Sequence, residues 1–483
     1  TMIALNDMGD VVLQFGAGTT RLDEDDSLAL TDERSSAVEL AGSFYSRAFE
    51  IAQRMAEANP GDPQARRHLF VSYQRLGSVQ LQSGRVMEAF SSYRQSMALA
   101  QQFAFDKPGD AQSQRDLSVS YEKLGDVQLQ LGELPEALAS YRRSLMISQA
   151  LATAAPNDAQ AQRDLSLSYS LLGNVQLQSG DLDQALASYH GSLAIRRRLA
   201  EADLSDAQAR RSLSVSYSKL GDVQLQNGDT EEALVSYRRC LEIFEGLALA
   251  DPGDAQAQSD LSLSYDRLGD VQLQNDEPTA ALASYRQGLE IRERLVKADP
   301  SDARAQRDFM VARYKIGGAY KSLGEFALAA EHYSAAAEAS RQMIERGMFV
   351  EASSRALAIM DEELATARLS ITALGDWDGL FEQPSTSWPE LLELRSLEFV
   401  RRSDFIAAAQ AAGKLRELES IDADRLFTAA GVFAASAASI KAVEGQTLTA
   451  ERQTQRQLWI DTSLTTLKQA IAAGWNDFDH LRQ

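Results

Sequence analysis

The sequence is poor in the residues that most often carry covalent cross-links and metal sites. Among its 483 residues are one cysteine, Cys240, and four histidines. A single cysteine excludes a disulfide within the chain, which fits a reducing, intracellular compartment, so we predict a cytoplasmic protein. The histidines share no motif with cysteines or carboxylates at metal-ligand spacing, and HExxH is absent. We therefore expect no metal site.

Long apolar runs and an excess of positive charge are also missing. No run of about 18 apolar residues occurs, and no signal peptide with a basic start and an apolar middle is visible. Lysine and arginine number 48 against 69 aspartates and glutamates, for a net charge of −21. Because binding to phosphates needs clustered basic residues, we expect no nucleic-acid partner and no membrane partner.

No catalytic motif is complete. The segment GGAYKS at 317–322 lacks the spacing of a phosphate-binding loop, and GAGTT at 16–20 is a lone glycine-rich turn. Kinase signatures such as HRD and DFG do not occur. Cys240 has no paired base that would activate it as a nucleophile. We therefore predict that the chain is not an enzyme and needs no cofactor.

What the sequence has in abundance is one repeated unit with a period of 48 residues. Self-similarity at a fixed period is the signature of a repeat array. The recurring positions are a glycine at Gly77, Gly125, Gly173, Gly221, Gly269 and Gly317, and a tyrosine at Tyr45, Tyr93, Tyr141, Tyr189, Tyr237, Tyr285 and Tyr333. An aspartate opens each unit, at Asp62, Asp110, Asp158, Asp206, Asp254 and Asp302.

The unit at 158–205 predicts two antiparallel helices. Asp158 follows a proline and is a good N-cap. Leu165, Tyr169, Leu172 and Gln176 then recur at helical spacing on one face. Gly180 and Asp181 break the helix, and a second apolar face follows up to about residue 201.

This pattern resembles the tetratricopeptide repeat. The residues that carry the resemblance are Tyr169, Leu172, Gly173, Gly180, Ala185 and Tyr189, with equivalent sets in the neighbouring units. The resemblance covers about residues 1–346 and implies an all-α fold, a right-handed superhelical solenoid of antiparallel helix pairs with a helical C-terminal region. The period of 48 exceeds the family's usual value of about 34.

A second departure from the family is a glutamine where a tyrosine is usual late in the first helix. It occurs at Gln80, Gln128, Gln176, Gln224 and Gln272. A buried amide must find hydrogen-bond partners or it destabilises the fold. We interpret these residues as a structural glutamine ladder that holds the register of the helices.

Two domains are predicted. Residues 1–346 hold seven repeats, the first interrupted by an acidic insertion at 17–36 that reads either as a solvated loop or as a segment that touches a partner. Residues 347–483 form a helical C-terminal region of degenerate repeats or a cap, with helices expected at 389–402, 404–419, 422–443 and 449–474. DRLFTAAGVFAASAASI and LKQAIAAGWNDFDHLR in this region resemble the ends of large bacterial proteins that carry a Ser/Thr kinase domain before such repeats. The abrupt, repeat-like start of the sequence suggests that it is cut from a longer protein.

The resemblance implies that the first helix of each pair lines a concave binding groove. Residues opposite the Tyr/Leu stripe are then expected to face a partner. They form an arginine row (Arg115, Arg163, Arg211), a mixed row (Glu122, Ser170, Ser218, Asp266), an acidic row (Asp126, Asn174, Asp222, Asp270) and a glutamine row (Gln130, Gln178, Gln226, Gln274). Tyr314 joins them from the last repeat, and an aliphatic row flanks them at Val71, Val119, Leu167, Val215 and Leu263.

The first functional hypothesis is a non-catalytic scaffold for protein–protein interaction that binds a peptide or an amphipathic helix of a partner. Asp126, Asp222 and Asp270 would repel a carboxylate, so a basic or neutral ligand is expected. The alternative is the regulatory or sensor arm of a larger enzyme, a kinase or protease, whose catalytic domain lies upstream in cis or in another subunit. Two further interpretations stay open: the rows merely reflect recent duplication, or the array self-associates.

Overall fold

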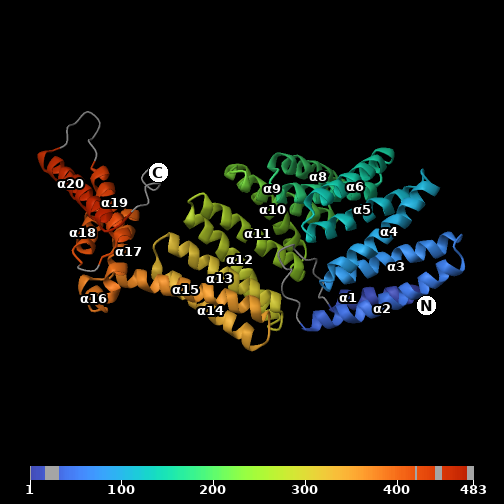
Figure 1. Cartoon of the computed structure of the whole chain (residues 1–483), viewed down its shortest axis with the longest axis horizontal. Helices are drawn as coiled ribbons and strands as arrows, with labels where there is room; N and C mark the ends of the chain where they lie inside the picture. Colours follow the sequence, from blue (N-terminus) through green and yellow to red (C-terminus); the bar gives the residue numbers. More distant parts are fainter. Residues whose placement is uncertain (1, 17–31, 419–420, 441–448, 476–483) are drawn as a thin grey trace. The chain divides into compact units, whose positions relative to one another are not determined.

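The computed structural model describes residues 2–16, 32–418, 421–440 and 449–475. Within these ranges every regular element is a helix (Figure 1). None of the described helices is both long enough and apolar enough to span a membrane. The all-α superhelical repeat expected from the sequence is confirmed.

The repeats are the expected helix pairs, and we call the first helix of each pair A and the second B. The A helices are α1 (Met2–Gly16), α3 (Pro63–Gln82), α5 (Ala111–Gln130), α7 (Ala159–Gln178), α9 (Ala207–Gln226), α11 (Ala255–Gln274) and α13 (Ala303–Ser322). The B helices are α2 (Asp32–Ala58), α4 (Val86–Asp106), α6 (Leu134–Ala154), α8 (Leu182–Ala202), α10 (Thr230–Ala250), α12 (Pro278–Ala298) and α14 (Phe326–Glu345). A helix of 20 residues is about 30 Å long.

The predicted insertion at 17–36 is partly wrong. Helix α2 already begins at Asp32, so residues 32–36 belong to a helix and not to a loop. Residues 17–31, which carry the acidic run, lie outside the described residues.

The C-terminal region is helical, as predicted. It contains α15 (Val350–Leu374), α16 (Trp377–Phe381), a 3₁₀ turn (Ser385–Ser387), α17 (Trp388–Arg401), α18 (Phe405–Arg416), α19 (Ala423–Ser439) and α20 (Ala450–Ala472). The expected helices match α17–α20 within a few residues, although α18 and α19 end earlier than the apolar pattern suggests.

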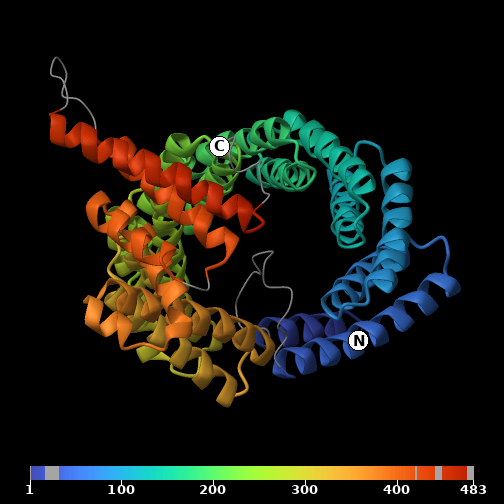
Figure 2. The same ribbon diagram turned by 60° about the vertical axis from the view of Figure 1, so that its left-hand side comes forward.

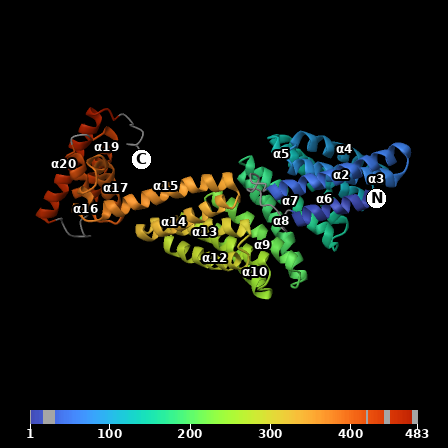
Figure 3. The same cartoon turned by 90° about the horizontal axis from the view of Figure 1, so that it is seen from below.

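The chain divides into two compact units, which we describe separately. The first unit comprises Thr1–Ala312 and Gln342–Ser354, and the second comprises Arg313–Arg341 and Arg355–Gln483. Within the first unit each helix from α2 to α11 packs on the helices before and after it. The blue-to-green helices follow a curved path in Figure 2, and Figure 3 shows the same stacking from below. The sequence-based boundary at 346 differs from this division, which cuts through the last repeat.

Local sequence explains where the helices of a repeat begin and end. The Asp158 side chain accepts hydrogen bonds from the backbone N–H groups of Gln160 and Ala161, as expected of an N-cap. After helix α7, Gly180 adopts a φ of +78°, a conformation in which a Cβ would be strained. The same pair of signals recurs in the neighbouring repeats and recreates the same helix pair, except that Asp276 adopts the positive φ in place of glycine after α11.

In the repeats that begin with α3 to α13, the recurring glycine of the A helix makes room for the tyrosine of its own B helix. A Cβ on Gly173 would lie 3.0 Å from the ring of Tyr189, and one on Gly269 would lie 2.4 Å from Cε1 of Tyr285. Both tyrosines are buried. The glycine and the tyrosine recur together because the tyrosine ring fits only where the facing helix has no Cβ.

The glutamine ladder is built from hydrogen bonds between the A and B helices of one repeat. The Ser92 and Ser140 hydroxyls each donate to a glutamine oxygen, Gln80 and Gln128, at 2.7 Å. At Gln176 the amide lies 2.7 Å from the Ser188 hydroxyl. The buried amides therefore have the partners that the structural interpretation required.

The second unit has a different interior. Its core is a cluster of apolar side chains from α15 to α20 that includes Leu380, Leu391, Leu392, Leu415 and Trp459. Trp377 and Phe381 stack at its margin, with ring centroids 5.9 Å apart. Fewer polar side chains are buried around this cluster, among them Arg395, which donates to the Ala373 carbonyl at 2.6 Å.

Candidate functional site

The A helices of the first unit leave one narrow strip of side chains at the surface, which we call the A edge. On each helix it consists of five residues spaced at i, i+4, i+8, i+11 and i+15, which share one face. On α5 and α7 these are Arg115, Val119, Lys123, Asp126 and Gln130, and Arg163, Leu167, Leu171, Asn174 and Gln178. On α9 and α11 they are Arg211, Val215, Lys219, Asp222 and Gln226, and Ser259, Leu263, Arg267, Asp270 and Gln274. All of these side chains are exposed or half-buried.

The arginine row of the A edge bridges neighbouring repeats. Arg115 Nε donates to Asp164 Oδ2 at 2.6 Å, and Arg211 Nε donates to Asp260 Oδ2 at 2.9 Å. Each aspartate lies one repeat further along, so the pair ties one A helix to the next. These arginines are on the predicted surface, but their charge is already matched within the protein.

The acidic row is engaged as well. The Tyr141 hydroxyl donates to Asp126 at 2.7 Å, and the Tyr237 hydroxyl donates to Asp222 at 2.6 Å. Burial, followed by the nearby carboxylate, raises the pKa of Tyr237 above its ordinary value, so this hydroxyl stays a donor. Asp222 also forms an ion pair with Arg267 of the next A helix at 2.6 Å.

The other two members of the acidic row follow the same pattern. The Tyr285 hydroxyl donates to Asp270 at 2.7 Å, and the Tyr189 hydroxyl donates to Asn174 at 2.6 Å. The row therefore connects helix A to helix B of its own repeat. Its carboxylates are structural acceptors as well as surface groups.

Three of the four residues of the mixed row, which we expected to face a partner, lie in the interior. Glu122, Ser218 and Asp266 are buried, with 7 %, 9 % and 2 % of their surface exposed. Ser170 is half-buried, and its hydroxyl lies 2.8 Å from that of Ser192. An A helix packs on its own B helix and on the neighbouring repeats, so the buried arc is wider than the Tyr/Leu stripe and includes this row.

Glu122 lies in a buried network of serines. The hydroxyls of Ser144 and Ser168 donate to Glu122 Oε1 at 2.8 and 2.9 Å. Burial raises the pKa of the Glu122 carboxyl, and the two hydroxyl donors oppose that shift. The carboxyl therefore lies within the packing between repeats, where it accepts hydrogen bonds from serines of two neighbouring helices.

Tyr314 is also placed differently from the prediction. It occupies the position that corresponds to Asp266, and its ring packs against Tyr333 with centroids 5.6 Å apart. The side chain is half-buried in the second unit. It contributes to packing there, for the same reason that the mixed row is buried.

Sequence reasoning missed the cationic row of the A edge. Lys123, Lys219 and Arg267 lie one turn after the aliphatic row, and Lys123 Nζ lies 3.2 Å from Asp126 Oδ2. The sequence could have revealed this row, because its residues follow the aliphatic residues by four positions and therefore share their helix face. The glutamine row, from Gln130 to Gln274, is exposed at the ends of the helices, as expected.

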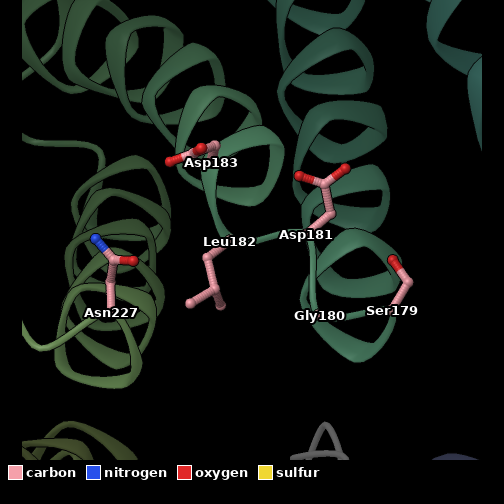
Figure 4. Close-up of a pocket in the computed structure, with 6 residues that line it drawn as sticks. All are labelled: Ser179, Gly180, Asp181, Leu182, Asp183 and Asn227. Atoms are coloured by element: carbon pink, nitrogen blue, oxygen red, sulfur yellow. The ribbon is translucent and has the colours of Figure 1, made fainter.

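An open hollow lies at the turn between α7 and α8, beside the end of α9 (Figure 4). It is lined by Ser179, Gly180, Asp181, Leu182, Asp183 and Asn227. The Asp181 side chain accepts from the backbone N–H of Gln184 at 3.3 Å and so caps α8. No group of three or more metal-ligating side chains is gathered anywhere in the described part of the chain.

Comparison with known proteins agrees with this geometry. Two family models described as tetratricopeptide repeat match residues 164–246 and 120–143. The repeats at these residues are of the tetratricopeptide type. A model of the bacterial transcriptional activator domain also matches the repeats, at residues 214–339. No curated protein matches the sequence significantly.

Three of the solved structures that resemble this chain are the following. BtubC (BKLC) from P. vanneervenii shares 22 % identity, with 54 % of this chain and 92 % of that chain covered and a TM-score of 0.43. A tetratricopeptide repeat protein from Parabacteroides merdae shares 15 %, with 74 % and 98 % covered and a TM-score of 0.35. The apo form of RapI shares 15 %, with 62 % and 98 % covered and a TM-score of 0.37. With TM-scores below 0.5, these likenesses support no conclusion about this chain.

Proposed function

We propose that this protein is a non-catalytic scaffold that holds a segment of a partner protein on the A edge of its first unit. The observation that carries the proposal is the aliphatic row Val71, Val119, Leu167, Val215 and Leu263, which stays exposed or half-buried in one register on five successive A helices. Aliphatic side chains aligned at a surface supply anchor contacts for a peptide or an amphipathic helix.

A basic or neutral ligand was expected because the acidic row would repel a carboxylate, and the contacts of that row weaken this argument. Asp126, Asp222 and Asp270 accept hydrogen bonds from buried tyrosines, and Asp222 is also paired with Arg267. A ligand therefore meets side chains whose charges are largely matched within the protein. The aliphatic row dominates what the A edge offers to a partner.

Photo-crosslinking from single positions tests the proposal. Benzoylphenylalanine is placed at Val215, which is 42 % exposed on the A edge, and in a control at Val235, which is 57 % exposed on helix α10. After irradiation in the producing cells, we expect a covalent adduct with one partner from position 215 and none from position 235. No adduct at 215, or the same adduct at both positions, would contradict the proposal.

The alternative, a regulatory arm of a kinase or protease, stays a prediction from the C-terminal resemblance. The same experiment addresses it, because a catalytic domain in cis would give an intramolecular crosslink, whereas a partner in another subunit would give an intermolecular one. The expected absence of catalysis, metal, cofactor, nucleic acid and membrane partners likewise remains a prediction.

A further inference from the structure

The repeat of α7 and α8 interrupts the charge pairing that its neighbours maintain. Arg115 and Arg211 each bind an aspartate of the following A helix, Asp164 and Asp260. The residue that corresponds to these aspartates for Arg163 is Ser212, which carries no charge. The Arg163 side chain is exposed and forms no hydrogen bond or ion pair among the described residues.

The same repeat is the most apolar part of the A edge. Leu167 is 44 % exposed, and Val215 on the next helix is 42 % exposed, whereas Val119 and Leu263 are half-buried. Leu171 takes the place that Lys123 and Lys219 have in the flanking helices. Arg163, Leu167 and Leu171 therefore form a cation followed by two aliphatic side chains along α7.

The carboxylates around Arg163 are already engaged within the protein. Asp206 is the counterpart of Asp158 and Asp254, which lie 3.9 and 3.3 Å from Arg115 and Arg211, and its side chain accepts from the backbone N–H of Ala209 at 2.9 Å. Asp164, the sequence neighbour of Arg163, is bound to Arg115 at 2.6 Å, and the equivalent carboxylate Asp116 is bound to Arg67. Arg115 and Arg211 flank Arg163 in the same row on α5 and α9. An unpaired guanidinium among paired neighbours is the one member of this row with free capacity for a carboxylate.

We propose that the α7 edge is the docking point of an extended peptide that carries an acidic residue followed by two aliphatic residues. Arg163 binds the carboxylate, and Leu167 and Leu171, with Val215 beside them, hold the aliphatic side chains. This inference rests on the proposed scaffold function and specifies its ligand.

Helix and strand geometry set the spacing of the peptide. Leu167 and Leu171 lie about 6 and 12 Å along the helix from Arg163, at about 1.5 Å per residue. An extended peptide advances about 3.3 Å per residue, so the aliphatic side chains fall about two and four residues from the acid. Alternate residues of an extended chain point to the same side. The expected pattern is an acid, any residue, an aliphatic, any residue and an aliphatic, in either chain direction.

A peptide selection tests this pattern directly. A phage-displayed library of random 12-residue peptides is selected on the full chain, and the most enriched peptide is synthesised with a fluorescent label. A second peptide carries lysine in place of its acidic residue. The Kd values of both are measured by fluorescence polarisation for the wild type, for R163E, and for the control R198E. Arg198 is an exposed arginine on helix α8 of the same repeat, so the control changes the net charge equally.

We expect enriched peptides with the acidic–aliphatic spacing given above. R163E should raise the Kd of the acidic peptide by at least about 10-fold, and its Kd for the lysine peptide should be lower than that of the wild type. The Kd values of R198E should stay within about 2-fold of the wild type. Unchanged helical circular dichroism of both variants shows that they remain folded.

Three results would overturn the inference: basic enriched peptides, equal effects of R163E and R198E, or no enriched peptide. The crosslink from Val215 is scored independently, so the scaffold proposal can stand when the peptide assignment fails.

Discussion

The interior between the repeats and the core of the second unit are stabilised in different ways. Between α5, α6 and α7 buried serine hydroxyls lie beside small apolar clusters, with Ser118 Oγ 2.9 Å from Ser144 Oγ and Ser148 Oγ 3.0 Å from Ser168 Oγ. In the second unit the equivalent space holds leucine, alanine and tryptophan side chains. The repeats thus combine small side chains with directional bonds, whereas the second unit relies on filled apolar volume.

This difference predicts how each region fails. A polar interior specifies the register of helices through satisfied hydrogen bonds, but it is destabilised strongly when one charge loses its partner. An apolar core is destabilised by cavities in proportion to the lost volume. Four changes, from the largest expected effect to the smallest, test this comparison.

The buried ion pair of Arg292 and Asp266 is the most vulnerable point of the polar interior. The two side chains are 3 % and 2 % exposed, and Nη1 lies 2.8 Å from Oδ1. Arg292→Met removes the buried cation from Asp266 and should lower the free energy of unfolding by about 4 kcal/mol. Urea denaturation followed by circular dichroism measures the change.

The preceding repeat provides a matched control, because Ser218 and Phe244 occupy the corresponding positions. The double change Asp266→Ser with Arg292→Phe should stay within about 1 kcal/mol of the wild type. If the double variant is as unstable as Arg292→Met, the loss does not come from the uncompensated charge.

Leu392 tests the apolar core of the second unit. It is fully buried in the cluster, so Leu392→Ala should leave a cavity and lower the free energy of unfolding by about 3 kcal/mol. All four tryptophans lie between 377 and 475, so tryptophan fluorescence reports unfolding of this region. Leu397→Ala, at a side chain that is 47 % exposed on the same helix, should have little effect. Equal losses for the two variants would refute the cavity explanation.

The glycine–tyrosine contacts test how tightly the helices of a repeat pack. Gly269→Ala should lower the free energy of unfolding by about 2 kcal/mol, because its Cβ would lie 2.4 Å from Cε1 of Tyr285. Gly173→Ala should cost less, since its Cβ would lie 3.0 Å from the Tyr189 ring. In the second unit a Cβ on Gly431 has no neighbour within 4 Å, so Gly431→Ala should instead stabilise α19 by up to about 1 kcal/mol. Thermal melts of the three variants establish the order, and a reversed order would contradict the packing argument.

Glu122 should give the smallest effect, with a distinctive pH dependence. Burial raises its pKa in the folded state, so the charged form destabilises the fold as pH rises through that pKa. Glu122→Gln keeps an oxygen for the serine hydroxyls and should stabilise the chain by about 1 kcal/mol at neutral pH. The gain should disappear in acid, where the wild-type carboxyl is protonated in both states.

Denaturation of both proteins across the pH range measures this gain. Glu136→Gln, at an exposed glutamate on α6, is the control and should show no such trend. A gain for Glu122→Gln that is independent of pH would exclude the buried charge as its cause.

Much of the architecture was predictable from the sequence. The period of 48, the Asp158 cap and the Gly180 turn are local signals, and local signals set where helices begin and end. The arginine, acidic and glutamine rows are exposed or half-buried on the face that helical periodicity indicates. The burial of Glu122 and Asp266 was not predictable in this way, because periodicity gives the direction of a side chain but not how many neighbouring helices cover it.

Local sequence signals specify the helices and the order in which they recur. Which repeated residues meet depends on how the helices stack. Arg115 reaches Asp164 across 49 residues, whereas Arg163 has only Ser212 at the same offset. That contrast follows from the stacking of successive repeats, which brings residues about one period apart into contact. The free cation beside Leu167 becomes visible only after each partner in the stack has been assigned.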